Sequence, residues 1–443
     1  MSSGPLVDTA NGTVSRLVYS DAAIYERELE RVFAGCWQFL GHDCYIPNLG
    51  DYLATYMGED PVILWRDDTG SPHAFLNTCR HRGNRLCLFE KGNAAAFTCG
   101  YHGWTYNSRG ELTGVPYHTE AYYDDFDREP WGLAEAPQLA NYGGLIFACW
   151  DPAAPSLDDF LGELRWYIDA ILLVAEDLGG YEVVASSRYE AHGNWKIPAE
   201  NFAGDHYHNP PTHGSTYKLG LRAGEFAGPQ HPHGPFEVAL KPGHGLGGLM
   251  IGQTAYEMDL NNAAKVGPEA VDYVTARWER LQARLAGAPA MPYSFSHALV
   301  FPNLAIWGGS ALRGIGLFQF HPRGPLDIEV RQNLLLPKQA PETVKLLARR
   351  DLGRGGHFAS GLFEQDDANN FERVTESTRT LLAQRYPFSF SMGLAQEGHW
   401  PGQEEWDVAG LPGLIGPRFS EHAQRHFYAY WAELMDHPAE NGS

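Results

Sequence analysis

Two short stretches decide the fold of this chain: CRHRGNRLC at residues 79–87 and CGYHGW at residues 99–104. In each stretch a cysteine precedes a histidine by two or three positions, and 17 residues separate the two pairs. Thiolate and imidazole together are ligands of zinc and of iron–sulfur clusters. The four predicted ligands are Cys79, His81, Cys99 and His102.

The order of these ligands distinguishes the two kinds of metal centre. Zinc sites of this composition usually pair Cys with Cys and His with His along the chain. A Rieske [2Fe–2S] cluster holds one iron by two thiolates and the other by two imidazoles, so each loop can give one ligand to each iron. The repeated Cys-then-His order therefore favours a Rieske cluster over zinc. Gly83 and Gly103 follow the two pairs and allow the backbone to turn closely around sulfur.

The composition is that of an ordinary globular protein, with 443 residues, 44% hydrophobic and 20% charged. The net charge of −21 argues against a general affinity for nucleic acid. Six cysteines are too few for a disulfide scaffold, so we expect reduced thiols. The sequence contains neither an apolar run of about 18 residues nor a signal-peptide pattern at its start. We therefore expect a cytoplasmic protein without a membrane or nucleic-acid partner.

The hydrophobic periodicity and the frequency of turn residues change along the chain. From about residue 38 to 155, short β-rich runs alternate with turn signals, and residues 61–77 predict a hairpin over Asp-Asp-Thr-Gly. Beyond this segment, strands mix with amphipathic helices without regular alternation, which favours an α+β fold. We predict an N-terminal helical segment over 1–37, an inserted antiparallel β domain over 38–155, and a larger domain over 156–443. Residues 221–252 are rich in Gly and Pro, which predicts a loop near the mouth of a site.

A second set of candidate ligands lies in GNWKIPAENFAGDHYHNPPTHG, residues 193–214. Asp205 and His208 are three positions apart, which places them on one face of a helix. The double proline that follows would end this helix, and His213 beyond it could approach the same point. Two histidines and a carboxylate form the facial triad of non-haem Fe(II) oxygenases, which leaves positions open for O₂ and substrate. On spacing alone, the carboxylate could be Asp205.

Together, these motifs resemble the large (alpha) subunits of Rieske non-haem iron aromatic-ring-hydroxylating dioxygenases, the naphthalene and biphenyl dioxygenase-like group. The resemblance covers nearly the whole chain. It implies a Rieske domain before a catalytic domain of helix-grip (Bet v 1-like, START-like) fold, in which an antiparallel sheet curves around a long helix. It also implies one [2Fe–2S] cluster and one mononuclear Fe(II) per chain. Respiratory Rieske proteins carry an extra cysteine in each loop; Tyr101 stands there in the second loop, which points to the oxygenase type.

The resemblance also assigns roles within the second motif. The matching positions are Glu200, Asn201, Asp205, His208 and His213. Both histidines become iron ligands, and Asn201 and Asp205 become catalytic, with Asp205 bonded to His208 and facing a Rieske histidine (His102 by the resemblance) of the neighbouring subunit. The third ligand comes from FEQDDANNF, where Asp367 matches the ligand position and Asp366 is the alternative. For Asp366 and Glu364 we favour a simpler role, as acidic residues at the start of a helix.

The resemblance further places five residues near the iron: Asn201, Phe202, His297, Phe358 and Phe363. Each phenylalanine could equally be ordinary core, but together they predict an apolar cavity lined by aromatic rings. The iron motifs contain no arginine that could hold a carboxylate. We therefore expect a hydrophobic aromatic substrate, polycyclic ones included, rather than an aromatic acid.

Three other features have alternative interpretations. Cys87 has no histidine partner, which favours a packed core thiol over a ligand. His206 falls off the face shared by Asp205 and His208, so we expect a pocket or surface residue rather than a ligand. Arg80, Arg82 and Arg85 could make structural hydrogen bonds, or they could form a basic patch that steers an acidic ferredoxin to the cluster.

The implied function is that of a bacterial terminal oxygenase that converts an aromatic ring to a cis-dihydrodiol with O₂. Its electrons would come from NADH through a separate ferredoxin reductase and ferredoxin, because no dinucleotide-binding GxGxxG motif is evident. A small (beta) subunit in an α3β3 assembly is expected, with α3 as the alternative. A monooxygenase or demethylase, or an aromatic-acid dioxygenase, of the same family remains an alternative. A pure Rieske electron-transfer protein is disfavoured by the second iron motif.

Overall fold

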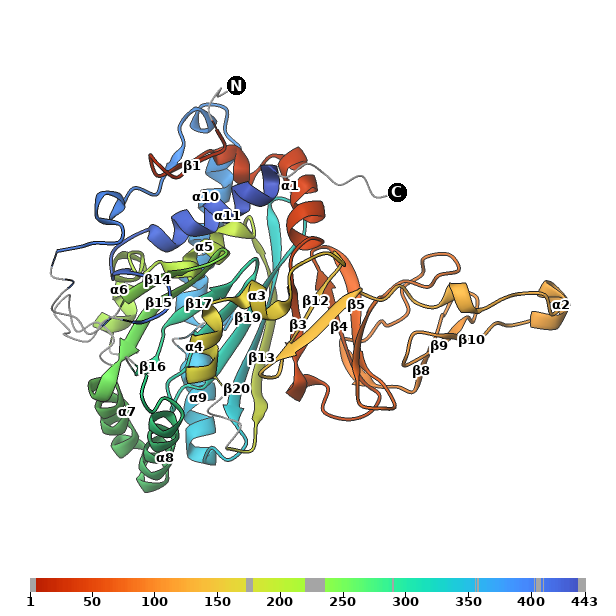
Figure 1. Ribbon diagram of the computed structural model, residues 1–443, viewed down its shortest axis with the longest axis horizontal. Coiled ribbons are helices and arrows are strands. Elements are labelled where there is room, and N and C mark those ends of the chain that lie inside the picture. Colours follow the sequence, from red (N-terminus) through yellow and green to blue (C-terminus); the bar gives the residue numbers. More distant parts are fainter. Residues whose placement is uncertain are drawn as a thin grey trace. The chain divides into compact units, whose positions relative to one another are not determined.

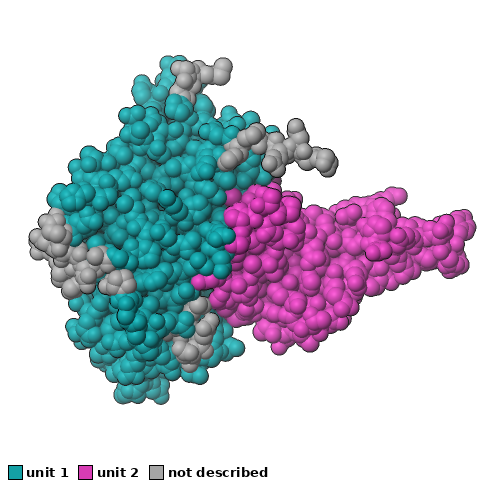
Figure 2. Space-filling model, viewed as in Figure 1, with its two compact units in different colours: residues 1–32, 158–443 teal, residues 33–157 magenta. Residues whose placement is uncertain are grey.

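The computed structural model describes residues 5–172, 178–219, 236–288, 291–354, 356, 358–401, 403, 408 and 410–436. The chain forms two compact units (Figure 2). The insert unit comprises residues 33–157, and the main unit comprises residues 1–32 and 158–443. Among the described residues, no helix is long and apolar enough to cross a membrane.

The insert unit is built from three antiparallel sheets (Figure 1). The largest has the order β6-β5-β4-β7, and the others have the orders β10-β9-β8 and β11-β12-β3. Their strands are β3 Gln38–His42, β4 Asp51–Met57, β5 Asp60–Arg66, β6 Pro72–Leu76, β7 Lys91–Asn93, β8 Ala96–Thr98, β9 Thr105–Asn107, β10 Leu112–Gly114, β11 Gln138–Tyr142 and β12 Leu145–Cys149. The helical segments are η3 Asp43–Tyr45, α2 His118–Tyr122 and η4 Glu129–Trp131.

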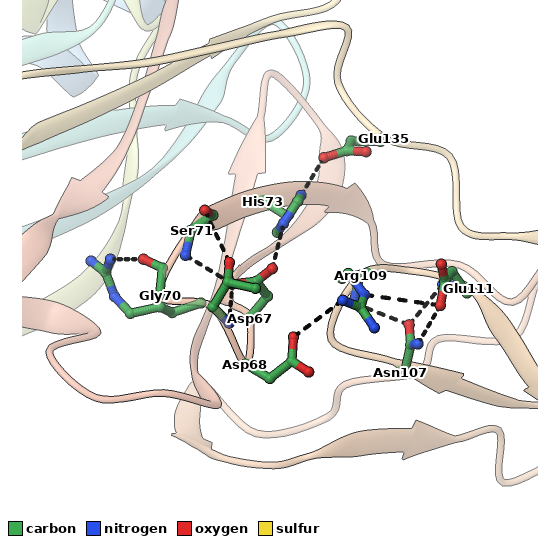
Figure 3. Close-up of polar contacts among 11 residues, drawn as sticks. Asp67, Asp68, Gly70, Ser71, His73, Asn107, Arg109, Glu111 and Glu135 are labelled. Carbon is green, nitrogen blue, oxygen red and sulfur yellow. Dashed lines mark hydrogen bonds and ion pairs between the residues drawn. The ribbon is translucent and has the colours of Figure 1, made fainter.

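The predicted hairpin over Asp-Asp-Thr-Gly is present between β5 and β6. In its turn, one oxygen of Asp67 accepts hydrogen bonds from the backbone N–H groups of Thr69 and Ser71 and from the Thr69 hydroxyl (Figure 3). These bonds hold the pKa of Asp67 at about 2, although burial acts in the opposite direction. An aspartate that bonds the backbone ahead of it specifies a tight turn, which fixes the register of the hairpin.

The main unit contains a nine-stranded antiparallel sheet of order β13-β20-β19-β18-β17-β15-β14-β22, with β16 paired to β15. Its strands are β13 Tyr181–His192, β14 Phe236–Leu240, β15 His244–Ile251, β16 Pro292–Ser294, β17 His297–Val300, β18 Leu304–Gly308, β19 Ile315–Pro322, β20 Asp327–Pro337 and β22 Leu414–Pro417. A small sheet of β1 Val7–Asp8, β2 Thr13–Val14 and β21 Phe388–Ser389 lies apart from it in the hydrogen-bonding pattern.

Helices of the main unit include α5, which packs on β15 and β17, and α11, which packs on β14, β15 and α5. The helices are η1 Arg16–Tyr19, α1 Ala22–Glu28, η2 Leu29–Phe33, α3 Leu157–Leu161, α4 Leu164–Ile171, α5 Lys196–Gly204, α6 Asn209–Lys218, α7 Gly252–Val266, α8 Pro268–Arg284, α9 Glu342–Arg354, α10 Leu362–Thr378, η6 Ala383–Arg385, η7 Leu394–Gln396 and α11 His422–Asp436. This is the predicted α+β arrangement, with an antiparallel sheet against a long C-terminal helix (Figure 1).

The sequence explains why α11 lies on the sheet. The adjacent Phe427 and Tyr428, Trp431 three or four positions later and Met435 four positions beyond it are at most 3% exposed, so they form one buried face. The Trp431 indole N–H donates to the buried carboxylate of Glu28 at 2.7 Å. The last described α-helix is thereby bonded to the first α-helix, α1.

The prediction of a loop over residues 221–252 is wrong for its second half. Residues 236–240 and 244–251 are strands β14 and β15, whereas residues 221–235 lie outside the described residues. Both strands are buried almost throughout, so their sequences lack the polar alternation that marks a half-exposed strand. The glycines of β15 disguise it further, because they occur where neighbouring groups come close. A Cβ on Gly245, for example, would lie 2.2 Å from the carbonyl oxygen of Ala203.

Candidate metal centres

The two cysteine–histidine loops of the insert unit share one backbone design. In each, the cysteine carbonyl accepts a hydrogen bond from the glycine four positions later: Gly83 N–H to Cys79 at 2.8 Å and Gly103 N–H to Cys99 at 2.9 Å. Both glycines have a left-handed φ, +70° and +76°, which side-chain-bearing residues rarely adopt. The glycines noted in the sequence are therefore required by the turns.

The four predicted cluster ligands lie in these two turns, where the two cysteine side chains are neighbours and the two histidine rings are neighbours. The His81 and His102 rings are 4.5 Å apart, and both cysteine side chains are buried. Within the part of the chain that the structure describes, the buried His81 Nδ1 has no hydrogen-bond partner. None of the six cysteines forms a disulfide. An orphaned ring nitrogen beside two reduced thiols fits a metal cluster, because a buried nitrogen without a partner is otherwise costly.

Hydrogen bonds around the sulfur atoms also fit this role. The Asn84 amide lies 3.7 Å from Cys99 Sγ, and the Tyr106 hydroxyl lies 3.4 Å from Cys79 Sγ. Burial raises the pKa of the Cys99 thiol, but N–H groups of Tyr101 and His102 outweigh this and lower it. Burial dominates at Cys79 and raises its pKa. A thiolate is the metal-binding form of cysteine, so donors aimed at sulfur favour ligation.

The other residues of the first loop are either buried in the core or exposed at the surface. Cys87 is buried in the core of the insert unit, and its backbone is bonded on both sides to the Asn77 side chain. Arg80, Arg82 and Arg85 are exposed, and Arg85 lies against Tyr56, with its guanidinium carbon 5.8 Å from the ring centroid. The arginines therefore present charge at the surface.

In the main unit, the predicted helix through Asp205 and His208 is wrong. Helix α5 ends at Gly204, and Asp205 has non-helical angles of φ −107° and ψ 76°. The double proline begins helix α6 at Asn209 instead of ending a helix, because a proline in the first turn loses no intrahelical hydrogen bond. His208 consequently lies in the bend between the two helices, and His213 lies on α6.

The bend nevertheless brings two histidines to a carboxylate of helix α10. One ligand atom each from His208, His213 and Asp367 lies within 4.8 Å of the others. An oxygen of Asp367 is 3.2 Å from His213 Nε2 and 3.7 Å from His208 Nε2. We call these three residues the iron set. Asp367 is 5% exposed and His213 is 1% exposed, which fits ligands facing a common ion rather than solvent.

Asp205 does not join the iron set but supports it. Its carboxylate lies 3.2 Å from His208 Nδ1 and also accepts the His208 backbone N–H. The Asn201 amide is 3.2 Å from the same Nδ1. Burial raises the pKa of Asp205, yet the His208 imidazole outweighs it and the pKa is lowered. Burial likewise lowers the pKa of His208, but Asp205 and Asp367 raise it to about 9.

The other acidic residues of FEQDDANNF and two predicted pocket phenylalanines lie on helix α10 or just before it. Helix α10 begins earlier than the acidic residues, at Leu362. Glu364 is buried and accepts a hydrogen bond from the Tyr189 hydroxyl, so it does more than complement the helix dipole. Asp366 lies 3.5 Å from His213 Nδ1. The Phe363 ring is 4.1 Å from the His213 ring. Phe358 is half-buried in the turn before α10, where its carbonyl accepts the Gly361 N–H.

A second group of two histidines and a carboxylate lies close to the iron set. His206, Glu237 and His297 each place a ligand atom within 4.8 Å of the others, and we call them the polar cluster. The His206 and His297 rings are 5.0 Å apart, and the Phe202 ring is 6.0 Å from that of His297. Sequence analysis missed Glu237. Its only signal was a charged residue inside the apolar run FEVAL, which we had assigned to a loop.

The geometry defines the class of protein: a chain with a Rieske-type Cys₂His₂ centre in a β insert and a two-histidine, one-carboxylate centre in an α+β unit. Comparison with known families gives the particular family. Residues 36–137 match the Rieske [2Fe-2S] domain, and residues 178–437 match the ring hydroxylating alpha subunit (catalytic domain). The chain belongs to this family of ring-hydroxylating oxygenase alpha subunits, which are oxidoreductases with a [2Fe–2S] cluster and a mononuclear iron.

Individual relatives agree with this assignment along the full chain. The biphenyl dioxygenase subunit alpha of Paraburkholderia xenovorans (strain LB400) is 36% identical, over 98% of this chain and 93% of that protein. The chlorobenzene dioxygenase subunit alpha of Cupriavidus sp. (strain PS12) is 38% identical, over 97% and 92%. A solved structure of naphthalene 1,2-dioxygenase with indole in the active site has a TM-score of 0.83 at 30% identity, over 97% of this chain and 93% of that one.

Proposed function

We propose that this chain is the oxygenase subunit that adds both atoms of O₂ to an aromatic ring and releases a cis-dihydrodiol. The observation that carries the proposal is the iron set, in which His208, His213 and Asp367 converge from a bend and two helices. Two histidines and one carboxylate would hold Fe(II) and leave positions on it for small molecules, as in non-haem iron oxygenases. The names of the relatives, which include biphenyl, chlorobenzene and benzene dioxygenases, support an aromatic ring as substrate.

Different residues of the chain would bind the cluster, bind the iron and contact the substrate. Cys79, Cys99, His81 and His102 would hold the [2Fe–2S] cluster, and the iron set would hold Fe(II). Bound there, the two groups supply single electrons and a reducing site for O₂. The rings of Phe363, beside His213 of the iron set, and of Phe202, beside His297, would exclude water and orient the substrate ring.

Asp205 would act as a positioning residue. By accepting a hydrogen bond from the Nδ1–H of His208, Asp205 would keep the proton on Nδ1 and leave Nε2 of the same ring unprotonated and aimed toward Asp367. Asn201 lies against the same nitrogen and would restrict rotation of the ring. The family resemblance adds that Asp205 would also face His102 of a neighbouring subunit, so that electrons pass between chains.

Such a chain would require partners. We propose a small beta subunit in an α3β3 assembly, and a ferredoxin with its NADH-dependent reductase, in the bacterial cytoplasm. The exposed Arg80, Arg82 and Arg85 beside the cluster loop would attract an acidic ferredoxin, since opposite charges accelerate association.

The test is to incubate the purified oxygenase with ferredoxin, reductase, NADH and a panel of aromatics under ¹⁸O₂, and to count labelled oxygen atoms in each product. Two labelled atoms in a cis-diol are expected. One labelled atom would indicate a monooxygenase or demethylase instead. Reduction of the cluster without any labelled product would indicate an electron carrier.

A further inference from the structure

The polar cluster is produced by the register of three strands. Glu237 of β14 is paired with Gly247 of β15, and Gly247 is paired with His297 of β17. Paired residues point to the same face of a sheet, so both side chains lean over the glycine between them. A Cβ on Gly247 would lie 2.1 Å from His297 Nε2 and 2.6 Å from Glu237 Oε2. The glycine therefore makes room for two converging polar groups.

These groups are deeply buried, and several of their side-chain polar atoms make no aligned hydrogen bond. Glu237 is 0% exposed, His206 is 5% exposed and His297 is 8% exposed. Among the described residues, both Glu237 oxygens, His206 Nδ1 and His297 Nε2 have no hydrogen-bond partner. His206 Nδ1 and Glu237 Oε1 are 2.9 Å apart but are not aligned for a hydrogen bond. Buried polar atoms are nearly always satisfied, so this cluster points to a bound polar group.

The surroundings indicate what that group belongs to. His206 stands between Asp205 and His208, directly beside the iron set. On its other side, the Phe202 ring contacts the rings of His297 and Phe318, at 6.0 and 5.8 Å. A polar corner next to an aromatic wall matches an aromatic ring that carries one polar substituent.

The type of atom sets the chemistry of the substituent. In either protonation state at least one carboxyl oxygen of Glu237 remains an acceptor that needs a donor, and His297 Nε2 can donate or accept according to its tautomer. A hydroxyl or amino group supplies a donor. A carboxylate substituent supplies only acceptors, so it cannot donate to an acceptor oxygen of Glu237.

We propose that His206, Glu237 and His297 recognise an uncharged O–H or N–H substituent on the aromatic substrate, so that this enzyme prefers hydroxy- or aminoarenes to hydrocarbons of the same size. The inference rests on the proposed function, whose substrate class it narrows.

The test compares phenol, aniline and toluene, which differ in one substituent of similar size. For the reconstituted oxygenase, we expect kcat/KM for phenol and aniline to exceed that for toluene by about tenfold, the effect of one well-made hydrogen bond. Glu237→Leu should bring the ratio close to one, whereas Glu237→Gln, which keeps an acceptor oxygen, should retain part of it. Equilibrium dialysis of phenol and toluene against the anaerobic holoprotein should show the same ratio in binding.

The matched control is Glu329→Gln, which alters another buried glutamate of the same sheet, on strand β20, without touching the polar cluster. It should leave the phenol-to-toluene ratio unchanged even if it lowers stability. An equal ratio in the wild type and in Glu237→Leu would overturn the proposal, while labelled toluene diol would leave the proposed function standing. Conversely, if no arene is oxygenated but dialysis shows the ratio, the proposed function fails and recognition stands.

The alternative that the polar cluster binds a metal ion is tested by titration with Zn²⁺. In an Asp367→Ala background, where the iron set lacks its carboxylate, Zn²⁺ is titrated with and without Glu237→Leu. Equal Zn²⁺ binding by both supports substrate recognition. One additional equivalent that Glu237→Leu abolishes would make the cluster a metal site and overturn the proposal.

Discussion

The described residues of the main unit include two groups of two histidines and a carboxylate, the iron set and the polar cluster. Because the residue types are the same, any difference in their roles must come from how the fold places them. The iron set comes from a bend and two helices, and His208 keeps a 19% exposed side chain. The polar cluster comes largely from strands that flank Gly247, and its carboxyl group is fully buried. The partly exposed iron set suits a metal site that O₂ and substrate can reach. The enclosed polar cluster suits recognition of a single substituent on the substrate.

The largest effect that separates the two groups is expected from His213→Ala. It should remove the mononuclear iron and reduce oxygenation to background, because a two-ligand site no longer competes for the metal. The visible spectrum of the [2Fe–2S] cluster should persist. Iron per chain, the spectrum and product yield are the measurements, with the exposed His399→Ala as control. Retention of mononuclear iron in His213→Ala would remove His213 from the iron set.

Asp205→Asn should have the next largest effect. Loss of the carboxylate beside His208 Nδ1 should lower turnover by about 10–100-fold, the usual range for residues that hold a metal ligand, while both metals stay bound. Asp366→Asn is the control and should keep most of the turnover. If Asp366→Asn instead loses iron, the ligand role passes from Asp367 to Asp366.

Gly247→Ala should disturb only the polar cluster. The new methyl group would collide with His297 Nε2 and Glu237 Oε2, and overpacking of this kind costs about 1–3 kcal/mol of stability. Denaturant unfolding should show the loss of stability. The iron content of the purified protein should not change, because the iron set is untouched. Gly353→Ala has no atom within 4 Å to meet and should leave stability nearly unaltered. Equal stability of both variants would show that the strands adjust freely around Gly247.

A difference in pH dependence contrasts Glu237 with Glu200, a partly exposed glutamate whose carboxyl group accepts hydrogen bonds from two tyrosines. Burial raises the pKa of Glu200 to about 8 from 4.5, even though hydrogen bonds from Tyr428 and Tyr19 lower it. The folded state therefore holds this proton more tightly than the unfolded state does. Between about pH 4.5 and 8, only the unfolded state has lost the proton, so stability falls by about 1.4 kcal/mol per pH unit and levels off above 8.

Glu200→Gln should remove this contribution. Its melting temperature relative to the wild type should rise steadily from pH 5 to pH 8, as measured by calorimetry at several pH values. Glu190→Gln, on the exposed side of β13, should run parallel to the wild type. A constant difference for Glu200→Gln would mean that Glu200 is already ionised throughout this range.

The parts of the site that sequence could predict are those where the chemistry is local. The two cysteine–histidine loops and their glycines were readable because the turn geometry is set within five residues. His208 and His213 were recognisable for the same reason, although the helix assigned around them was wrong. Asp367 required the family resemblance, since nothing near it in the chain points to His213. The ligand assignments themselves remain predictions that the variants above address.

The sequence alone determined the composition of the chain, the paired Cys–His loops and hence the Rieske class, and the α+β character of the rest. Only the tertiary structure decided where helix α5 ends, that β14 and β15 are strands, and that Glu237 meets His206 and His297. The physical reason is that strand register acts across space. Glycines and buried charges look like loop signals in a linear pattern, and their purpose appears only when neighbouring strands bring the side chains over them.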